Sequence, residues 1–148
     1  GTLDAYFDAI ANDQSVFGLS DGGAHCGVLC DASVPTYMMS YVARDRKKKL
    51  PLELVVNRMT KNTASVYGLD DRGVIAPGYL ADLNIIDFKA ISLEPPEMVY
   101  DLPSNGKRLI QKANGYIATI KRGEVTFEHG EATGALPGKL LRGSVSTN

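Results

Sequence analysis

The sequence predicts an α/β fold in which a helical first half precedes a β-rich second half. In the first half, apolar residues recur at helical spacing, and Pro35 and Pro51 stand where helices can begin. From Gly73 onward, glycines and prolines separate short runs of β-branched and aromatic residues, which is typical of strands joined by turns. The composition changes near Leu69, so the predicted parts are residues 1–68 and 69–148.

The first half is expected to form a helix, a short strand, a loop and two more helices. The first helix rests on the spacing of Leu3, Tyr6, Phe7 and Ile10. The apolar run Val16 to Leu19 follows and is the predicted strand. The second helix begins at Pro35 and carries an apolar stripe made of Tyr37, Met38, Tyr41 and Val42.

The third helix is predicted to begin at Pro51 and to end at Gly68. Asn62 and Thr63 are weak helix formers and are a candidate break within it. The basic run Arg44 to Lys49 lies between the two helices. It is interpreted as the solvated end of the second helix, where cations favour the helix dipole.

Short β-branched and aromatic runs in the second half predict four strands. They are Leu83–Asp87, Leu109–Lys112, Ile117–Arg122 and Glu124–Glu128. A turn is expected at Arg122 and Gly123. The stretch Glu94–Gly106 contains three prolines, at positions 95, 96 and 103, and is expected to be a long connection.

Charge and composition exclude several classes of partner. The chain has 16 Lys and Arg against 17 Asp and Glu, so its charge favours neither nucleic acid nor an anionic membrane. No stretch approaches the roughly 20 apolar residues that span a bilayer, and no export signal is visible. Cys26 and Cys30 share one short loop, which is unlike a disulfide framework. We therefore expect a cytoplasmic protein with reduced thiols.

Three local patterns follow one another along the chain. The first is Ser20-Asp21-Gly22-Gly23-Ala24-His25, directly after an apolar run. The second runs from Met59-Thr60-Lys61-Asn62-Thr63-Ala64 through Asp71-Arg72-Gly73 and Pro77-Gly78 to Ala81-Asp82-Leu83. The third is Val99-Tyr100-Asp101-Leu102-Pro103, followed by Gly134-Ala135-Leu136-Pro137-Gly138 and Leu141-Arg142-Gly143. Together they resemble the C-terminal region of the amidohydrolase superfamily, in the branch that contains the N-acyl-D-amino-acid deacylases.

This resemblance implies a (β/α)₈ barrel beside a small β-sandwich domain. Such a barrel needs about 250 residues. Residues 1–68 would therefore supply the last strand and helices of the barrel, and residues 69–148 would be the C-terminal share of the small domain. Dihydroorotases, hydantoinases and deacylases share the barrel, and the choice of deacylase rests on the third pattern.

Asp21 is the predicted catalytic residue. In the family the Asp at this position contacts a metal-bound water and takes up its proton, so the resemblance also implies that Asp21 touches the metal. Gly22, Gly23 and His25 are the predicted substrate-binding residues, because glycines let the main chain approach a ligand and a histidine can stabilise charge on a carbonyl oxygen. Ser-Asp-Gly-Gly is also ordinary turn chemistry, so the local alternative is that Asp21 caps a turn.

The histidines that this metal centre needs are not in the sequence. The resemblance implies zinc or another divalent metal in the parent enzyme, held by histidines that begin with a His-x-His pair. This chain has only His25 and His129. We therefore expect the isolated chain to bind no catalytic metal tightly and to be inactive. His25, Cys26 and Cys30 are too few ligands for structural zinc, and His129 is interpreted as an exposed histidine in a turn.

Two functions remain open on the sequence. The first is the C-terminal part of a metal-dependent amidohydrolase with a small N-acyl amino acid as substrate. The second is a non-catalytic, β-rich binding or scaffolding module. In either case the incomplete sheet and barrel predict self-association, because unpaired edges and uncovered apolar faces favour contacts with another chain. Asp82 and Asp87 are expected to cap or cross-link loops.

Overall fold

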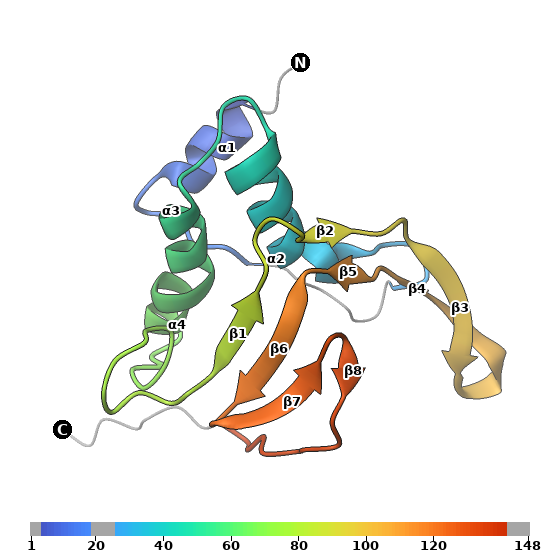
Figure 1. Ribbon diagram of the computed structural model, residues 1–148. Coiled ribbons are helices and arrows are strands. Elements are labelled where there is room, and N and C mark those ends of the chain that lie inside the picture. Colours follow the sequence, from blue (N-terminus) through green and yellow to red (C-terminus); the bar gives the residue numbers. More distant parts are fainter. Residues whose placement is uncertain (1–3, 19–25, 142–148) are drawn as a thin grey trace.

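The computed structural model describes residues 4–18 and 26–141 of the 148-residue chain. Helices occupy the first half of the described chain and strands the second, as predicted (Figure 1). The helical elements of the first half are α1 (Asp4–Ala11), η1 (Asp31–Ser33), α2 (Val34–Tyr37), η2 (Met38–Asp45), α3 (Leu52–Asn57), η3 (Arg58–Asn62) and α4 (Thr63–Val66). A mixed α/β fold is thereby confirmed.

The second and third predicted helices each combine α-helical and π-helical turns. Elements α2 and η2 form one helix with Pro35 in its first turn, and α3, η3 and α4 form the next helix after Pro51. The candidate break at Asn62 and Thr63 is wrong, because both residues keep helical backbone angles and only the helix type changes there. The Thr63 hydroxyl donates to the carbonyl oxygen of Arg58 at 2.7 Å, which satisfies a backbone acceptor inside the helix.

The predicted helix end at Gly68 is confirmed. Gly68 has φ +65°, the left-handed conformation that only glycine adopts without strain. Its N–H donates to Ser65 O at 3.1 Å, and the Leu69 N–H donates to Ala64 O at 2.9 Å. These two bonds form a Schellman motif, which satisfies the last free carbonyls of α4.

The second half consists of antiparallel strands. They are β1 (Leu83–Ile86), β2 (Ser92–Leu93), β3 (Glu97–Leu102), β4 (Gly106–Ile110), β5 (Ala113–Asn114), β6 (Tyr116–Lys121), β7 (Glu124–Glu128) and β8 (Glu131–Ala132). A four-stranded sheet has the order β1-β6-β7-β8, and β2–β5 and β3–β4 form two separate pairs. Strands β1, β6 and β7 confirm the prediction, as does the turn at Arg122 and Gly123, where both residues have positive φ.

The predicted long connection Glu94–Gly106 is wrong, because it contains β3. Prolines 95 and 96 precede this strand, and Pro103 follows it in the turn η4 (Pro103–Asn105). Proline cannot donate to a strand ladder, so these residues mark the ends of the strand and leave its interior free to pair with β4. The strand predicted at Leu109–Lys112 accordingly begins earlier, at Gly106.

The strand predicted at Val16 to Leu19 is also wrong for the residues that the structure covers. Residues 16–18 belong to no strand, since no neighbouring strand of the described chain pairs with them. Phe17 instead packs its ring against the helices. The barrel and the sandwich implied by the resemblance therefore stay predictions.

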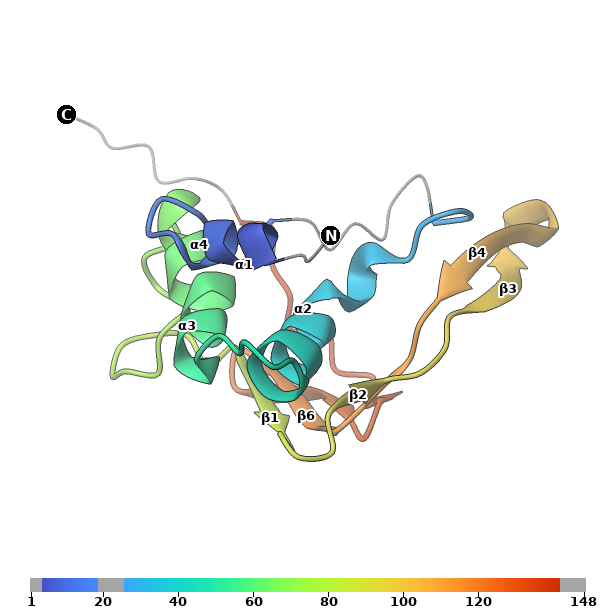
Figure 2. The same cartoon turned by 90° about the horizontal axis from the view of Figure 1, so that it is seen from above.

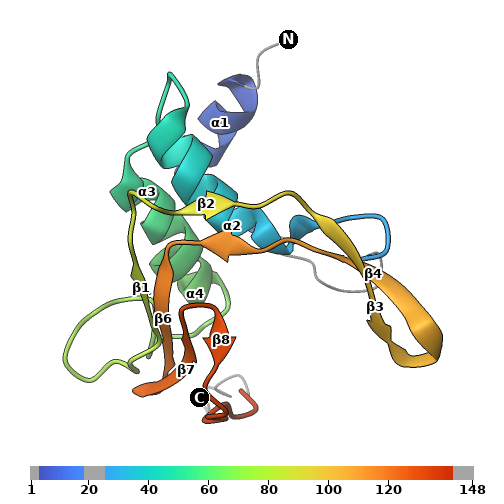
Figure 3. The same cartoon turned by 45° about the vertical axis from the view of Figure 1, so that its right-hand side comes forward.

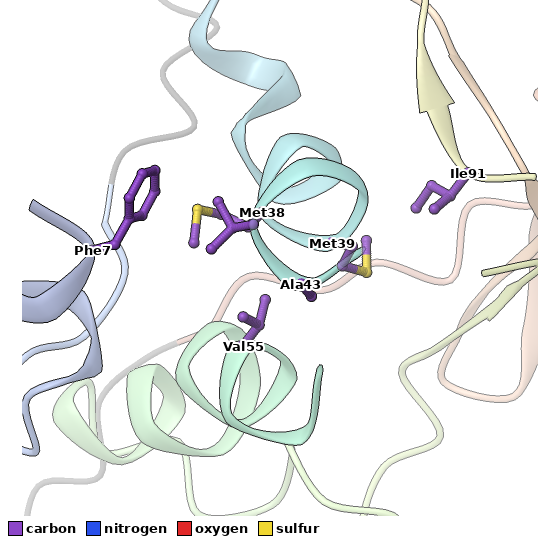
Figure 4. Packing of buried hydrophobic residues seen from close by; sticks show 7 residues of the cluster. Phe7, Met38, Met39, Ala43, Val55 and Ile91 are labelled. Atoms are coloured by element: carbon purple, nitrogen blue, oxygen red, sulfur yellow. The ribbon is translucent and has the colours of Figure 1, made fainter. Parts of the chain in front are cut away.

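One hydrophobic core joins the helices to the strands. Its buried members, of which Figure 4 labels six, are Phe7, Met38, Met39, Val42, Ala43, Val55 and Ile91. Met38, Met39 and Ala43 project from η2 toward Phe7 on one side, Val55 below and Ile91 on the strand side (Figure 4). Ile91 lies beyond residue 69, so the core crosses the predicted boundary between residues 1–68 and 69–148. Whether these parts are separate domains stays a prediction.

The hairpin β3–β4 lies outside this core. Figures 1 and 3 show it pointing away from the helices and from the four-stranded sheet. On β3 the large apolar side chains Met98, Tyr100 and Leu102 are exposed.

The basic run Arg44 to Lys49 is only in part the solvated helix end that was predicted. The Arg44 guanidinium donates to the carbonyl oxygens of Phe88 and Ile91, at 3.0 and 2.7 Å. Arg46 donates to Asp4 and lies 4.0 Å above the ring of Phe7. The lysines at positions 47–49 are exposed. Both arginines thus donate hydrogen bonds within the folded chain, because one guanidinium can donate to several acceptors at once.

Candidate functional site

The predicted site residues Asp21, Gly22, Gly23 and His25 lie outside the described residues. Their catalytic, substrate-binding and metal-binding roles therefore stay predictions. What the structure describes is how the chain is held on both sides of this segment, at Phe17 and at Cys26.

The chain before the segment is held by the third helix. Phe17 packs against the core, and its carbonyl oxygen lies 3.3 Å from the Thr63 hydroxyl. Arg58 holds the loop that precedes Phe17: its buried guanidinium donates to the Asp13 carboxylate at 2.9 Å. Thr63 belongs to the second sequence pattern, so at least one residue of that pattern positions the chain that leads to Asp21.

The chain after the segment is held by the hairpin β3–β4. The Leu109 N–H on β4 donates to the Cys26 carbonyl oxygen at 2.6 Å. Leu109 pairs with Met98 on the other side, so β4 lies between β3 and the loop that follows the segment. Figure 2 shows this loop next to β4, at the start of the helix α2. Sequence analysis missed this contact, because the backbone pairing depends on β3.

A small cavity lies between this loop and β4. Its volume is about 190 Å³. Its lining includes the two thiols of Cys26 and Cys30 together with the polar side chains of Asp31, Arg108 and Gln111. It is the described cavity next to the predicted catalytic segment, and it offers both a cation and a carboxylate. No sequence signal placed Arg108 and Gln111 here, because they arrive on a strand distant in sequence.

Arg108 is held in place by Asp101 across the hairpin. The guanidinium donates to both carboxylate oxygens, with distances of 2.8 and 2.6 Å. This pairing lowers the pKa of Asp101 and raises the pKa of Arg108. Asp101 stands in the third sequence pattern, and its described role is to orient a residue that lines the cavity.

The Ala81-Asp82-Leu83 pattern is architectural, as predicted. One oxygen of the Asp82 carboxylate accepts from Arg72 at 3.1 Å and from Lys121, and the other accepts from the backbone N–H of Arg122 at 2.9 Å. Partial burial opposes ionisation of Asp82, but the hydrogen bonds from Lys121 and the Arg122 N–H, with the charges of Lys121 and Arg72, together outweigh it, so the pKa of Asp82 is lowered. Asp82 therefore joins the loop after α4 to the β6–β7 turn.

Asp87 and His129 also match their predicted roles. Asp87 caps a turn, because its Oδ1 accepts from the N–H groups of Lys89 and Ala90 at 2.9 and 3.2 Å. His129 is exposed, has φ 49° and lies between β7 and β8. It lines a shallow cavity of about 170 Å³ beside Tyr116 and Phe127, remote in sequence from the segment of Asp21.

The part of the chain that the structure covers contains no set of side chains that could bind a metal ion. Among residues 4–18 and 26–141, no group of three or more His, Cys, Asp or Glu side chains is close enough to hold an ion. The described residues therefore do not fit a zinc centre by themselves. The expected absence of tightly bound metal stays a prediction, because Asp21 and His25 lie outside those ranges.

Comparison with known proteins defines the class. A model of the amidohydrolase family matches residues 2–127, so the chain belongs to the amidohydrolase family. An allantoinase of Deinococcus radiodurans is 31% identical over 98 residues, which are 65% of this chain and 21% of that protein. The crystal structure of a D-aminoacylase matches with a TM-score of 0.53 and 27% identity, over 68% of this chain and 19% of that one.

These comparisons confirm the superfamily that the three sequence patterns indicated. The chain spans about a fifth of the length of the relatives it matches. The likeness is therefore to part of an amidohydrolase.

Proposed function

We propose that this chain is part of a metal-dependent amidohydrolase that hydrolyses carbon–nitrogen bonds other than peptide bonds, with N-acyl-D-amino acids as substrates. The observation that carries the proposal is the family match over residues 2–127. The likeness to a D-aminoacylase structure at 27% identity supports the choice of substrate. The allantoinase relative supports a competing choice, the substrate of an allantoinase.

Asp21 is the proposed catalytic residue, and Gly22, Gly23 and His25 are the proposed substrate-binding residues. Fixed flanks on both sides of the segment support this proposal. Phe17 before it packs against the core, and the Cys26 carbonyl oxygen after it accepts a hydrogen bond from β4. A carboxylate there suits amide hydrolysis, because it can accept a proton from the attacking water and return it to the leaving amine. Cys26, which follows the segment directly in sequence, lines a cavity together with Arg108.

The isolated chain is proposed to be inactive. Its two histidines are fewer than the proposed zinc or other divalent metal centre needs, and the described residues offer no metal donor set. The purified chain, assayed with N-acyl-D-amino acids and added zinc, should release amino acid at the rate of a buffer blank. Turnover above that blank would contradict this part of the proposal.

The activity itself is tested on the protein encoded by the complete reading frame. With that protein, Asp21→Asn should lower kcat for N-acyl-D-amino acids by about a hundredfold or more. Asp70→Asn is the control, because Asp70 is exposed on the loop after α4. Metal content is measured in parallel. Equal kcat for both variants would exclude Asp21 as a catalytic residue.

A binding or scaffolding module is the competing proposal. The observation that favours it is the hairpin β3–β4, which exposes Tyr100 at 60% and lies outside the core. The two proposals differ in the upstream reading frame: a His-x-His pair after an early strand supports the enzyme, and its absence supports the module.

We also propose that the chain associates with a second copy of itself. Exposed apolar side chains on a strand that no other element of the described chain covers favour contacts with another chain. Exposed apolar side chains of the hairpin, Met98, Tyr100 and Leu102, are the proposed contact.

A cytoplasmic location and the absence of nucleic-acid and membrane partners remain proposals that rest on the balanced charge. Across the described residues, no helix has the length and apolar character needed to cross a membrane.

A further inference from the structure

The cavity between the loop at residues 26–32 and β4 contains both cysteines of the chain. Cys26 and Cys30 are free thiols, each half-buried, and both line this space of about 190 Å³. The chain turns at residues 26–28, and three residues separate Cys26 from Cys30. The shared cavity therefore places two thiols of one short loop around the same small space.

The backbone of each cysteine is fixed by a hydrogen bond. The Cys26 carbonyl oxygen accepts from the Leu109 N–H of β4 at 2.6 Å. The Cys30 carbonyl oxygen accepts from the Ser33 hydroxyl at 3.3 Å, at the start of the 3₁₀ turn η1. Between these fixed points stand only Gly27, Val28 and Leu29. Both thiols therefore line one cavity on a short segment whose two ends are hydrogen-bonded to the rest of the fold.

The surroundings suit thiol chemistry. Thiol–disulfide exchange needs a thiol that a small disulfide can reach, and both cysteines are partly exposed at the cavity. The half-buried cysteines leave room for a small disulfide reagent to approach.

We propose that Cys26 and Cys30 form a reversible disulfide bond in exchange with a low-molecular-weight disulfide such as oxidised glutathione. The thiolate of one cysteine attacks a glutathione sulfur, which releases one reduced glutathione and leaves a mixed disulfide. The second cysteine then attacks the protein sulfur and releases the second reduced glutathione. In total the protein loses two protons and two electrons, equivalent to two hydrogen atoms, which the two released glutathione thiols carry.

This bond would close a short ring that directly follows the segment of the proposed catalytic residue Asp21, with its backbone fixed to β4 at Leu109. The proposal goes beyond amide hydrolysis and does not depend on it. Its test measures free thiols and the mass of the chain, not hydrolysis. The disulfide proposal can therefore fail while the proposed activity stands, and the activity can fail while the disulfide forms.

The test places the purified chain in glutathione buffers of graded redox ratio, followed by acid quench, alkylation and mass spectrometry. The expected product is the monomeric chain that has lost two hydrogen atoms and has no alkylatable thiol, with the bond mapped to the peptide that contains both cysteines. Excess dithiothreitol should restore both thiols. Cys26→Ser and Cys30→Ser should each stop at the mixed disulfide with glutathione.

A second measurement shows whether the fold contributes. The same redox series is run in concentrated urea, where only the short separation in sequence favours the bond. The equilibrium ratio of disulfide to dithiol should be at least tenfold higher in the folded chain. A ratio of disulfide to dithiol that is equal or lower in the folded chain would overturn the proposal. So would an unsubstituted chain that yields only intermolecular disulfides or only mixed disulfides with glutathione.

Discussion

The helix η2 and the strand β3 carry similar apolar patterns but differ in what the fold does with them. In η2, the side chains of Met38, Met39, Val42 and Ala43 are buried, and Val42 is completely inaccessible. In β3, every residue except Val99 is exposed. The difference shows that apolar residues predict burial only where a second element is available to cover them.

The physical reason lies in how each element satisfies its backbone. A helix makes its hydrogen bonds internally, so neighbours need only supply apolar contacts, as α1, α3 and Ile91 do for η2. A two-stranded hairpin is marginally stable in water and needs a further strand or a covering face. The hairpin β3–β4 receives some of that support from the Cys26 carbonyl and from the Asp101–Arg108 ion pair.

The largest effect is expected where the core meets the strands. Gly115 has φ +90°, and a Cβ there would lie 2.6 Å from Ile91 Cα and 2.7 Å from Ile91 N. These are backbone atoms of a fully buried residue and cannot move aside. Gly115→Ala should lower the free energy of unfolding by about 3 kcal/mol, from strain plus overlap. Urea denaturation followed by circular dichroism measures it.

The control is Gly134→Ala. Gly134 also has φ +90°, but its Cβ would meet no atom within 4 Å. This variant should lose only about 1 kcal/mol, the cost of the backbone angle alone. Equal losses for the two variants would mean that Gly115 does not approach Ile91 as closely as described.

The next largest effect compares the stability contributed by a buried helix residue with that of an exposed sheet residue. Val55 on α3 is 0% exposed and Val125 on β7 is 40% exposed. Val55→Ala should destabilise the chain by about 2 kcal/mol through lost burial and the cavity left behind. Val125→Ala should cost about 0.5 kcal/mol or less. Denaturation midpoints that shift equally would show that the helices are no better packed than the sheet.

Self-association tests the uncovered hairpin. If the exposed face of β3 forms the contact, Tyr100→Lys should weaken association about tenfold, or about 1.4 kcal/mol, by placing a charge in an apolar interface. Tyr67→Lys is the matched control, because Tyr67 is 73% exposed at the end of α4. Light scattering over a dilution series measures both. A monomer at every concentration of the unsubstituted chain would contradict the proposal.

The smallest effect concerns the charged link between the two regions. The pKa of Asp82 is lowered in the folded chain, so its ionised form contributes stability above the unfolded pKa of about 4 and loses it as pH falls through the folded pKa. Asp82→Asn should cost about 1 kcal/mol at pH 7 and progressively less below pH 4. Asp70→Asn, with an exposed carboxylate, should leave stability nearly unchanged at both pH values. A cost that persists in acid would assign the effect to packing.

The sequence by itself determined the local elements and the family. Helices beginning near Pro35 and Pro51, the helix end at Gly68 and the turn at Arg122–Gly123 depend on neighbouring residues, so spacing and turn chemistry were sufficient. The patterns around Asp21, Asp82 and Asp101 likewise indicated an amidohydrolase, which the family match over residues 2–127 confirmed.

The tertiary structure decided what depends on partners distant in sequence. Strand β3 exists because β4 pairs with it, and residues 16–18 are not a strand because no described strand lies beside them. Arg44 and Arg46 are partly buried because they donate hydrogen bonds to acceptors distant in sequence. The thiol cavity formed because Arg108 and Leu109 came to rest against the loop of Cys26 and Cys30. Such contacts join residues far apart along the chain, and local patterns carry no record of them.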